Sequence, residues 1–300
     1  MNYNIRKNYN LLIDYESYGI KPPQKFRPNL NTINENYDVR VNLNDYGLKP
    51  TDSILITDYI VGEGTSSCIY KGKYNELDVG IKTIKKEWMN DFDYESINRE
   101  ISIHSNLDHN NIIKFYKNYE TNSEIKIVLE YADTDLKNIM KKERLTENKC
   151  KNITKNVING LKYLHDKDII HRDIKPSNIL LKNNVPKICD FGLSKNEKII
   201  LNNGFVGTNG YIAPEIQNGF NYTSKVDMWA LGIIIFQMIG GYHPYSSIPC
   251  KFSTANINYS NRYWENISNN CKDFINNLLI CDPNDRISAN EAFNHEWLLI

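Results

Sequence analysis

The sequence predicts an α+β protein of two lobes, in which an antiparallel β-sheet lobe with one helix precedes a mainly α-helical lobe. Short apolar runs of strand type fill most of residues 54–131, and a single helical pattern interrupts them. After residue 131 helical patterns dominate. A chain of 300 residues is long enough for two such lobes, or for one large domain with an appendage.

Residues 1–53 are expected to form an N-terminal arm, because they are rich in Asn, Tyr and Pro and lack sustained periodicity. The arm holds a repeat of an Asn-Tyr pair, a mostly apolar trio and a Tyr-Gly-Ile/Leu-Lys-Pro segment. This last segment occupies residues 18–22 and recurs 28 positions later, at residues 46–50. Two copies are too few for a solenoid. The repeat is therefore either a docking segment, for an unknown partner or for the same chain, or a duplicated tether that packs loosely.

The first lobe is expected over residues 54–131, with strands at 54–61, 68–73, 79–84 and 125–131. A helical period joins Ile97, Ile101, Ile103, His104 and Leu107, and the polar turn at residues 108–110 ends it. The second lobe is expected over residues 132–300. Its strongest helical patterns lie at 145–164, 225–239, 271–279 and 289–297.

Composition argues against a protein governed by its global charge. Lys and Arg together number 36, as do Asp and Glu, so we expect neither nucleic acid nor a membrane surface as partner.

Six scattered cysteines without metal spacing are expected to be reduced thiols. No signal peptide or bilayer-length apolar run is found, which predicts a cytoplasmic protein. The abundance of Asn, Lys, Ile and Tyr suggests AT-rich coding, as in some protists and large DNA viruses; a viral protein would act in the host cytoplasm.

Two motifs between residues 171 and 192 carry the chemistry. Residues 171–178 read His-Arg-Asp-Ile-Lys-Pro-Ser-Asn, and residues 190–192 read Asp-Phe-Gly. Together they supply carboxylates, an amide and a lysine. Phosphoryl transfer needs in-line positioning and charge neutralisation more than covalent chemistry, and these groups suit it.

Further motifs follow in a fixed order. They are Gly62-Glu63-Gly64, Val79-Gly80-Ile81-Lys82 with Glu100 eighteen residues later, Ala213-Pro214-Glu215, and Asp282 to Arg286. With these motifs, residues 54–300 resemble the eukaryotic Ser/Thr protein kinase domain. Residues 100–104 are similar to polo and Aurora kinases, residues 267–297 to calcium/calmodulin-dependent kinases, and residues 187–190 to MAP kinases.

The resemblance implies a site for ATP. Lys82 would contact the α- and β-phosphates, Glu100 would hold its ammonium, and Asp135 would accept from the ribose hydroxyls. The glycine-rich loop and the adenine site would use Val61, Gly62, Glu63, Gly64, Ile69, Leu180 and the backbone of Glu130 and Ala132. Ser67 stands where the loop usually has a third glycine, and Gly80 where an Ala methyl usually faces adenine.

The resemblance also implies the catalytic roles. Asp173 would orient the acceptor hydroxyl as a base, and Lys175 would contact the transferring phosphoryl group. Asn178 and Asp190 would hold Mg²⁺. Lys175, together with Gly207-Thr208, favours Ser/Thr acceptors on a protein substrate.

Several residues are expected to be structural. His171 and Phe191 would stack in the core that aligns the lobes, and Asp227 would brace the catalytic loop. Glu215 would pair with Arg286. His104 is interpreted as a packing residue, with a pH switch as the alternative.

The activation segment departs from the pattern that Arg172 implies, in which an arginine receives a phosphate. Residues 195–206 contain no Ser, Thr or Tyr. We therefore expect activity without phosphorylation there, with the ordering charge coming from Glu197 or a partner.

Because the sequence ends at Ile300, directly after the last helical pattern, no regulation through a calmodulin-binding or polo-type tail is expected.

These observations predict an ATP-dependent Ser/Thr protein kinase. The alternative from another class is a pseudokinase-like scaffold that uses the arm for binding. Its usual signature is the loss of Lys82, Asp173, Asn178 or Asp190, and all four are present. Transfer to Tyr as well as Ser/Thr is a further alternative.

Overall fold

The computed structural model describes residues 39–40, 54–63, 67–196, 206–245, 257–259 and 261–299. The chain divides into two compact units, Met1–Tyr37 and Asp38–Ile300, and every described residue belongs to the second. Most of the expected arm therefore lies outside the described residues, as do Gly64 and Glu197.

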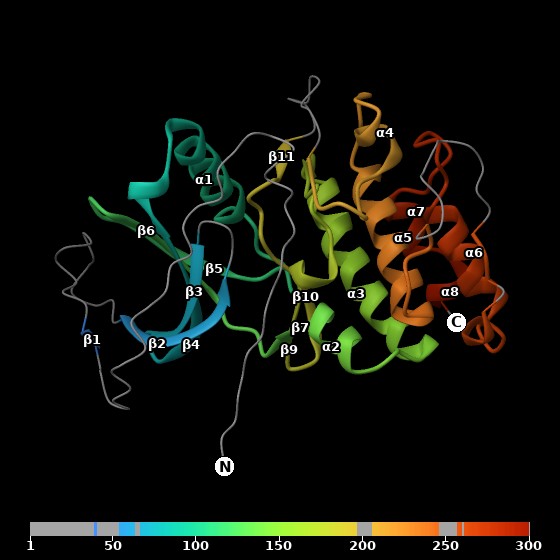
Figure 1. Ribbon diagram of the computed structural model, residues 1–300, viewed down its shortest axis with the longest axis horizontal. Helices are drawn as coiled ribbons and strands as arrows, with labels where there is room; N and C mark the ends of the chain where they lie inside the picture. The colour runs from blue at the N-terminus through green and yellow to red at the C-terminus, as the bar shows by residue number, and fades with distance from the viewer. Residues whose placement is uncertain are drawn as a thin grey trace, which may run out of the picture. The chain divides into compact units, whose positions relative to one another are not determined.

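A six-stranded antiparallel sheet forms the first part of this unit, in the order β1-β2-β3-β4-β6-β5 (Figure 1). Its strands are β1 (Val39–Arg40), β2 (Ile54–Glu63), β3 (Ser67–Tyr74), β4 (Leu77–Lys85), β5 (Phe115–Glu120) and β6 (Glu124–Glu130). The four predicted strands are present within three residues at each end. β1 is formed by two residues of the arm, which pair with Leu55 and Ile56 of β2.

Strand β5 and the two-residue strand β1 are the parts of the sheet that the sequence analysis missed. The pairing of β5 with β6 shifts register between Phe115 and Lys117. Phe115 therefore packs into one apolar cluster while Tyr116 and Tyr119 pack into another. A bulge of this kind breaks the alternation of period two on which strand prediction rests.

The alternation along β4 sorts its side chains onto the two faces of the sheet. Val79 and Ile81 lie in the cluster on one face. Ile84 lies in the cluster on the opposite face, which Ile97 and Ile101 of α1 (Asp91–His104) cover. Helix α1 begins at a capping box, in which the Asn90 side chain accepts from the backbone of Asp93 and the Asp93 side chain accepts from the backbone of Asn90. It ends at His104, one turn earlier than the predicted helical period.

The second part of the unit is mainly helical and surrounds one large apolar core. Its helices are α2 (Leu136–Lys142), α3 (Glu147–His165), α4 (Pro214–Gln217), α5 (Lys225–Gly240), α6 (Asn269–Leu278), α7 (Ala289–Phe293) and α8 (Glu296–Leu299). Helix α5 is buried along almost its whole length, because it is apolar on all sides. Among the described residues, no helix has both the length and the apolar composition needed to cross a membrane.

The single helix predicted for residues 289–297 is wrong, because the chain forms α7 and α8 with a break between them. At the break, Asn294 leaves the helical conformation as the C-cap of α7. His295 then accepts a hydrogen bond from the backbone of Trp297 and pairs with Asp273 of α6 at 3.1 Å. A contact between distant segments thus overrides the local helical pattern.

Short strands and turns of 3-10 helix complete the unit. The strands are β7 (Thr134–Asp135), β8 (Ile169–Ile170), β9 (Ile179–Lys182), β10 (Val185–Ile188) and β11 (Lys195–Asn196), and the 3-10 turns are η3 (Lys86–Trp88), η4 (Pro176–Asn178) and η6 (Arg262–Trp264). Strand β9 pairs with β10 and β7, and β8 pairs with β11. Residues 171–178 are therefore held between two strands that belong to different small sheets.

Candidate active site

Lys82 of β4 forms an ion pair with Glu100 of α1. Lys82 lies two residues from Ile84 and so shares the sheet face that α1 covers. Its Nζ lies 2.6 Å from Glu100 Oε1 and 3.5 Å from Asp190 Oδ1. Burial alone would lower the pKa of Lys82, but the carboxylates of Glu100 and Asp190 raise it. Lys82 therefore stays a cation held between two carboxylates.

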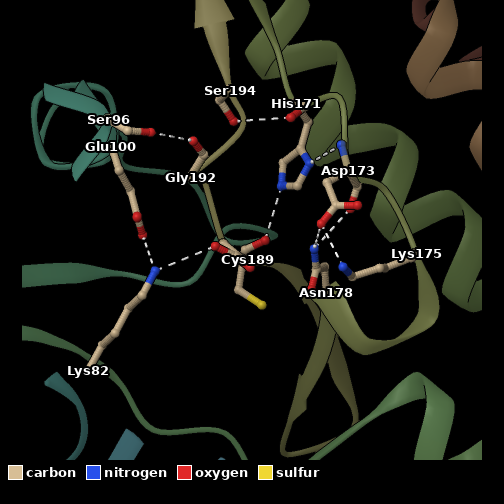
Figure 2. Close-up of polar contacts among 11 residues, drawn as sticks. Lys82, Ser96, Glu100, His171, Asp173, Lys175, Asn178, Cys189, Gly192 and Ser194 are labelled. Carbon is tan, nitrogen blue, oxygen red and sulfur yellow. Dashed lines mark hydrogen bonds and ion pairs between the residues drawn. The ribbon is translucent and has the colours of Figure 1, made fainter. Parts of the chain in front are cut away.

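Asp173 is the centre of a second cluster, on the catalytic loop. Its Oδ2 accepts hydrogen bonds from Lys175 Nζ at 2.7 Å and from Asn178 Nδ2 at 3.0 Å. Its Oδ1 accepts from the Thr208 hydroxyl at 2.6 Å, and Lys175 also donates to Thr208 at 2.8 Å. Figure 2 shows Lys82 and Glu100 on one side of the site, and Asp173, Lys175 and Asn178 on the other.

Asp227 of α5 braces the backbone of this loop, as predicted. Its two carboxylate oxygens accept from the backbone N–H of His171 at 2.9 Å and of Arg172 at 2.8 Å. His165 of α3 contacts the same carboxylate at 3.0 Å. Burial would raise the pKa of Asp227, but His165 and these N–H groups hold it below its usual value. The brace keeps Arg172 in a left-handed backbone conformation, with φ at 67°.

His171 and Phe191 pack together in the core, as predicted, edge to face with ring centroids 5.2 Å apart. Both are fully buried. The sequence analysis did not foresee that His104 of α1 is the third ring, 4.6 Å from Phe191. The imidazole of His104 hydrogen-bonds to the backbone oxygen of Ile113 at 2.7 Å, and burial lowers its pKa to about 4. His104 is therefore a neutral packing residue near pH 7.

Helix α1 also contacts the chain just after Asp190 through residues that no motif marked. Ser96 donates to the backbone oxygen of Gly192 at 3.5 Å (Figure 2). Arg99 donates to Ser96 at 3.1 Å. Asp190 itself adopts a left-handed conformation, with φ at 66°. Burial would raise the pKa of Asp190, but Lys82 holds it below its usual value. The Asp190 carboxylate is therefore ionised and faces Lys82.

The residues expected around adenine and ribose lie along the strands that lead into the site. Gly62 of β2 pairs with Ile69 of β3, and Val61 and Glu63 flank Gly62 on the same strand. Leu180 belongs to β9, where it faces Asp135 in the strand register, and Ala132 lies between β6 and β7.

Two of these residues have side-chain partners that the sequence did not predict. The Asp135 carboxylate caps α2, accepting from the Asn138 backbone at 2.6 Å and from its side chain at 2.7 Å. The Glu130 carboxylate pairs with Lys182 at 2.9 Å and Lys187 at 3.1 Å.

The donor set of the site fits Mg²⁺. Because Asn178 donates its amide N–H groups to the Asp173 backbone at 2.9 Å and to the Asp173 carboxylate, its amide oxygen is left to act as a ligand. Asp190 adds an ionised carboxylate. In the part of the chain that the structure describes, no group of three or more His, Cys, Asp or Glu side chains could hold a metal. Mg²⁺ usually binds through one or two protein oxygens together with substrate phosphates, so this pair is sufficient.

Arg172 is held by groups of the protein itself. Its Nε donates to the Leu193 backbone oxygen at 2.6 Å, and one guanidinium NH₂ donates to the Tyr222 hydroxyl at 2.8 Å. Sequence reasoning missed both partners, since Tyr222 lies fifty residues away. Ser194 is fully buried and donates to the backbone of His171 at 3.3 Å.

The predicted pair of Glu215 and Arg286 is present and bidentate. Two guanidinium nitrogens of Arg286 donate to the two carboxylate oxygens of Glu215, at 2.7 and 2.9 Å. Arg286 is 0% exposed and Glu215 4% exposed. This pair ties the segment that follows the catalytic loop to the region after α6.

A sheet lobe with a buried lysine–glutamate pair, followed by a helical lobe with an Asp-Lys-Asn loop, defines the class of protein as a protein kinase. The protein kinase domain family matches residues 56–298, and the chain belongs to this family.

Three relatives illustrate the similarity. Over 254 residues the chain is 34% identical to myosin light chain kinase A of Dictyostelium discoideum, covering 79% of this chain and 85% of that protein. It is 30% identical over 254 residues to calcium/calmodulin-dependent protein kinase type 1 of Caenorhabditis briggsae, covering 80% and 71%. It is 34% identical over 253 residues to calcium/calmodulin-dependent protein kinase type IV of Mus musculus, covering 79% and 53%. The protein is an ATP-dependent serine/threonine protein kinase.

Proposed function

We propose that this kinase transfers the γ-phosphoryl group of ATP to protein Ser/Thr hydroxyls through Lys82, Asp173, Lys175, Asn178 and Asp190. The observation that carries the assignment is the pair of facing clusters. Lys82 is held between Glu100 and Asp190, and Asp173 binds Lys175 and Asn178. A nucleotide between the clusters meets cations and metal ligands on both sides.

Each side chain has a task that its contacts support. Hydrogen bonds from Thr208, Lys175 and Asn178 orient the carboxylate of Asp173. Asp173 therefore accepts a hydrogen bond from the substrate hydroxyl and then its proton. As the new O–P bond forms, the bond to ADP breaks. Lys175 and Lys82 neutralise the phosphate oxygens during this exchange. Asn178 and Asp190 would hold Mg²⁺, which would add to the charge neutralisation at the phosphates.

Phosphorylation of a peptide library by wild type, Asp173→Asn and Asp190→Asn tests this assignment. Each substitution should lower kcat at least about a hundredfold, as expected for loss of a base or a metal carboxylate. Asp166→Asn, an exposed carboxylate at the end of α3, is the matched control and should keep its activity. Phosphoamino-acid analysis should show phosphoserine and phosphothreonine. Wild-type protein that binds ATP but phosphorylates nothing would favour the scaffold function instead.

We also propose that the enzyme is active without phosphorylation of its activation segment. The Arg172 guanidinium already has the Leu193 carbonyl and the Tyr222 hydroxyl as partners. Of the hydroxyls between residues 193 and 208, Ser194 is fully buried and Thr208 is bound to Asp173. No further Ser, Thr or Tyr stands between these two residues.

Phosphatase treatment followed by mass spectrometry tests this second proposal. Protein that carries no phosphate within residues 193–208 should keep its kcat/KM. Tyr222→Phe should lower kcat/KM several-fold, because Arg172 loses a partner. Loss of activity on dephosphorylation of this segment would refute the proposal.

We further propose that the second repeat copy of the arm docks on the sheet of its own chain. Val39 and Arg40, in the apolar trio of that copy, pair with Ile56 and Leu55. Val39→Pro should speed amide hydrogen exchange in β2 relative to Val39→Thr, because proline cannot donate to the ladder. Equal exchange rates in the two variants would contradict the docking.

A further inference from the structure

A pocket of about 260 Å³ lies beside the catalytic loop. Lys137, Met140, Lys141, Glu143 and Arg144 line it from α2 and the residues that follow; Pro176, Tyr211 and the end of α5 complete it. We call it the basic pocket. None of the residues assigned above to ATP, Mg²⁺ or the transfer itself lines it.

The basic pocket lies where a protein substrate has to pass. Tyr211 is shared between this pocket and the small cavity lined by Asp173 and Thr208. Pro176 directly follows Lys175, which contacts Asp173. A substrate hydroxyl at Asp173 belongs to a chain that continues in both directions, at about 3.3 Å per residue when extended. A side chain a few residues from the acceptor therefore reaches the pocket.

The charge of the pocket favours an anionic side chain. Three cations line it against one carboxylate, and that carboxylate, Glu143, is paired with Lys149 at 2.9 Å. Lys137 and Lys141 are one turn apart on α2 and so lie on the same face of the helix. Ser177, which directly follows Pro176 of the pocket, carries no charge. A basic substrate side chain would meet repulsion here.

Arg144 is the cation that the fold holds in place. Its guanidinium lies over the ring of Tyr263, 3.3 Å from the ring centroid. On the pocket side it lies against Gly241, the left-handed C-cap of α5, where a Cβ would collide with the guanidinium. Stacking uses the faces of the guanidinium, whereas its N–H groups lie in the plane and donate sideways. A guanidinium held in this way loses little freedom when it binds a carboxylate.

We propose that the basic pocket selects protein substrates that carry an acidic side chain a few residues from the phosphorylated hydroxyl, with Arg144 binding the carboxylate. Met140, Met238 and Pro176 supply an apolar floor for the methylene groups of a Glu or Asp. This inference rests on the proposed function, because it assumes that Asp173 receives the acceptor hydroxyl.

Steady-state kinetics on three peptide sets test the proposal, using the full chain. The sets differ only in carrying Glu, Gln or Lys at one position, which is moved along both sides of the acceptor. At one or two positions, kcat/KM for Glu should exceed that for Gln by roughly tenfold, equivalent to about 1.4 kcal/mol, mainly through a lower KM. Lys at those positions should be the poorest.

Arg144→Gln should bring the Glu/Gln ratio of kcat/KM close to one, and Arg144→Glu should make Lys the preferred residue. Arg262→Gln is the matched control, since Arg262 contacts the same Tyr263 ring at 5.1 Å but does not line the pocket. It should keep the ratio of the wild type. A ratio of two rate constants does not depend on how much of a variant is folded.

Three results would overturn the proposal: an equal or greater preference for Lys in the wild type, an unchanged ratio in both Arg144 variants, or an equal loss in Arg262→Gln. In each of them the enzyme still phosphorylates peptides and the proposed function stands. Failure to phosphorylate any peptide set would instead refute the proposed function.

Discussion

At the scale of single residues, the charge states of the site depend on a few neighbours. Lys82 is buried as a cation because Glu100 and Asp190 lie within 3.5 Å of it. Removing Glu100 would leave burial as the main influence on the Lys82 pKa and would free a four-carbon side chain to move. The lysine–glutamate pair therefore sets both the charge and the position of the ammonium.

Gly80 of β4 is a residue at which a methyl group should improve nucleotide binding. A Cβ there would lie 3.4 Å from Ile69 Cγ2 and, its two chain neighbours aside, would meet no other atom of the described residues within 4 Å. Gly80→Ala should therefore tighten ATP binding by up to about 0.8 kcal/mol, close to fourfold in Kd. Titration calorimetry measures the change. Gly72→Ala is the contrast, because its Cβ would collide with Leu55 and Ile81 and should destabilise the fold. Unchanged or weaker ATP binding by Gly80→Ala would show that this surface does not face adenine.

His104 should make the stability of the kinase pH-dependent. Its pKa is about 4 in the folded chain and 6.5 in the unfolded chain, so the unfolded chain binds more protons as the pH falls below 6.5. The free energy of unfolding should therefore drop by about 2 kcal/mol between pH 7 and pH 5 from this residue alone. Urea unfolding of wild type and His104→Leu measures it. The variant should show a flatter profile over that range; an identical slope in both proteins would exclude His104 as the cause.

At the scale of elements, the connection from β6 to the small sheet is held by one carboxylate. Glu130, the last residue of β6, bonds Lys182 of β9 and Lys187 of β10, and it also accepts from the backbone of Lys114 at 3.1 Å. Burial would raise the pKa of Glu130, but Lys182 and the Lys114 N–H hold it below its usual value. The two lobes are thus linked by an ionic contact beside the expected adenine site.

Glu130→Gln should destabilise the kinase by about 1–2 kcal/mol, since three charge-assisted contacts are weakened. The effect should be lost as the pH falls through the lowered pKa of Glu130, because the wild-type carboxylate is then protonated as well. Urea unfolding at neutral and acid pH measures both. Asp166→Asn, which breaks an exposed pair with Lys162, should change stability by less than about 0.5 kcal/mol. Equal effects in the two variants would contradict the role of Glu130.

The elements also show where the sequence pattern of one segment is sufficient to predict a helix or strand. Helix α3 lies within two residues of its predicted bounds, because its apolar stripe and its Thr146 cap both belong to one segment. Strand β5 and the break between α7 and α8 were missed. A bulge at Phe115 and a contact between His295 and Asp273 determine them, and both depend on residues elsewhere in the chain.

At the scale of the whole molecule, the buried pair of Glu215 and Arg286 ties together segments seventy residues apart. Besides Glu215, Arg286 donates to the backbone oxygens of Ile280 at 2.9 Å, Lys225 at 2.9 Å and Cys281 at 3.2 Å. Its guanidinium also lies 5.1 Å from the ring centroid of Trp229. One buried cation thus ties Glu215 and the start of α5 to the residues after α6.

Arg286→Ala should lower the free energy of unfolding by about 3–5 kcal/mol, because it leaves the Glu215 carboxylate buried without its partner. This loss is a large share of the total free energy of unfolding of a domain of ordinary stability. If Arg286→Ala does not fold, Glu215→Gln with Arg286→Met removes both charges and should lose less. The exposed Arg262→Ala should stay within about 0.5 kcal/mol of the wild type. A loss of activity in Arg286→Ala at unchanged stability would instead indicate a direct role in catalysis.

The sequence by itself determined the family, the order of the two lobes and the residues expected to carry the chemistry, because these depend on motif order and on periods within one segment. Tertiary structure alone decided the contacts that no motif predicts. It placed Leu193 and Tyr222 on Arg172, His104 on Phe191, and Arg144 between Tyr263 and Gly241. Such contacts join residues that are far apart in the chain, and they form only once the core has fixed the distances between elements. The regulation and substrate preference proposed for this kinase rest on contacts of this second kind.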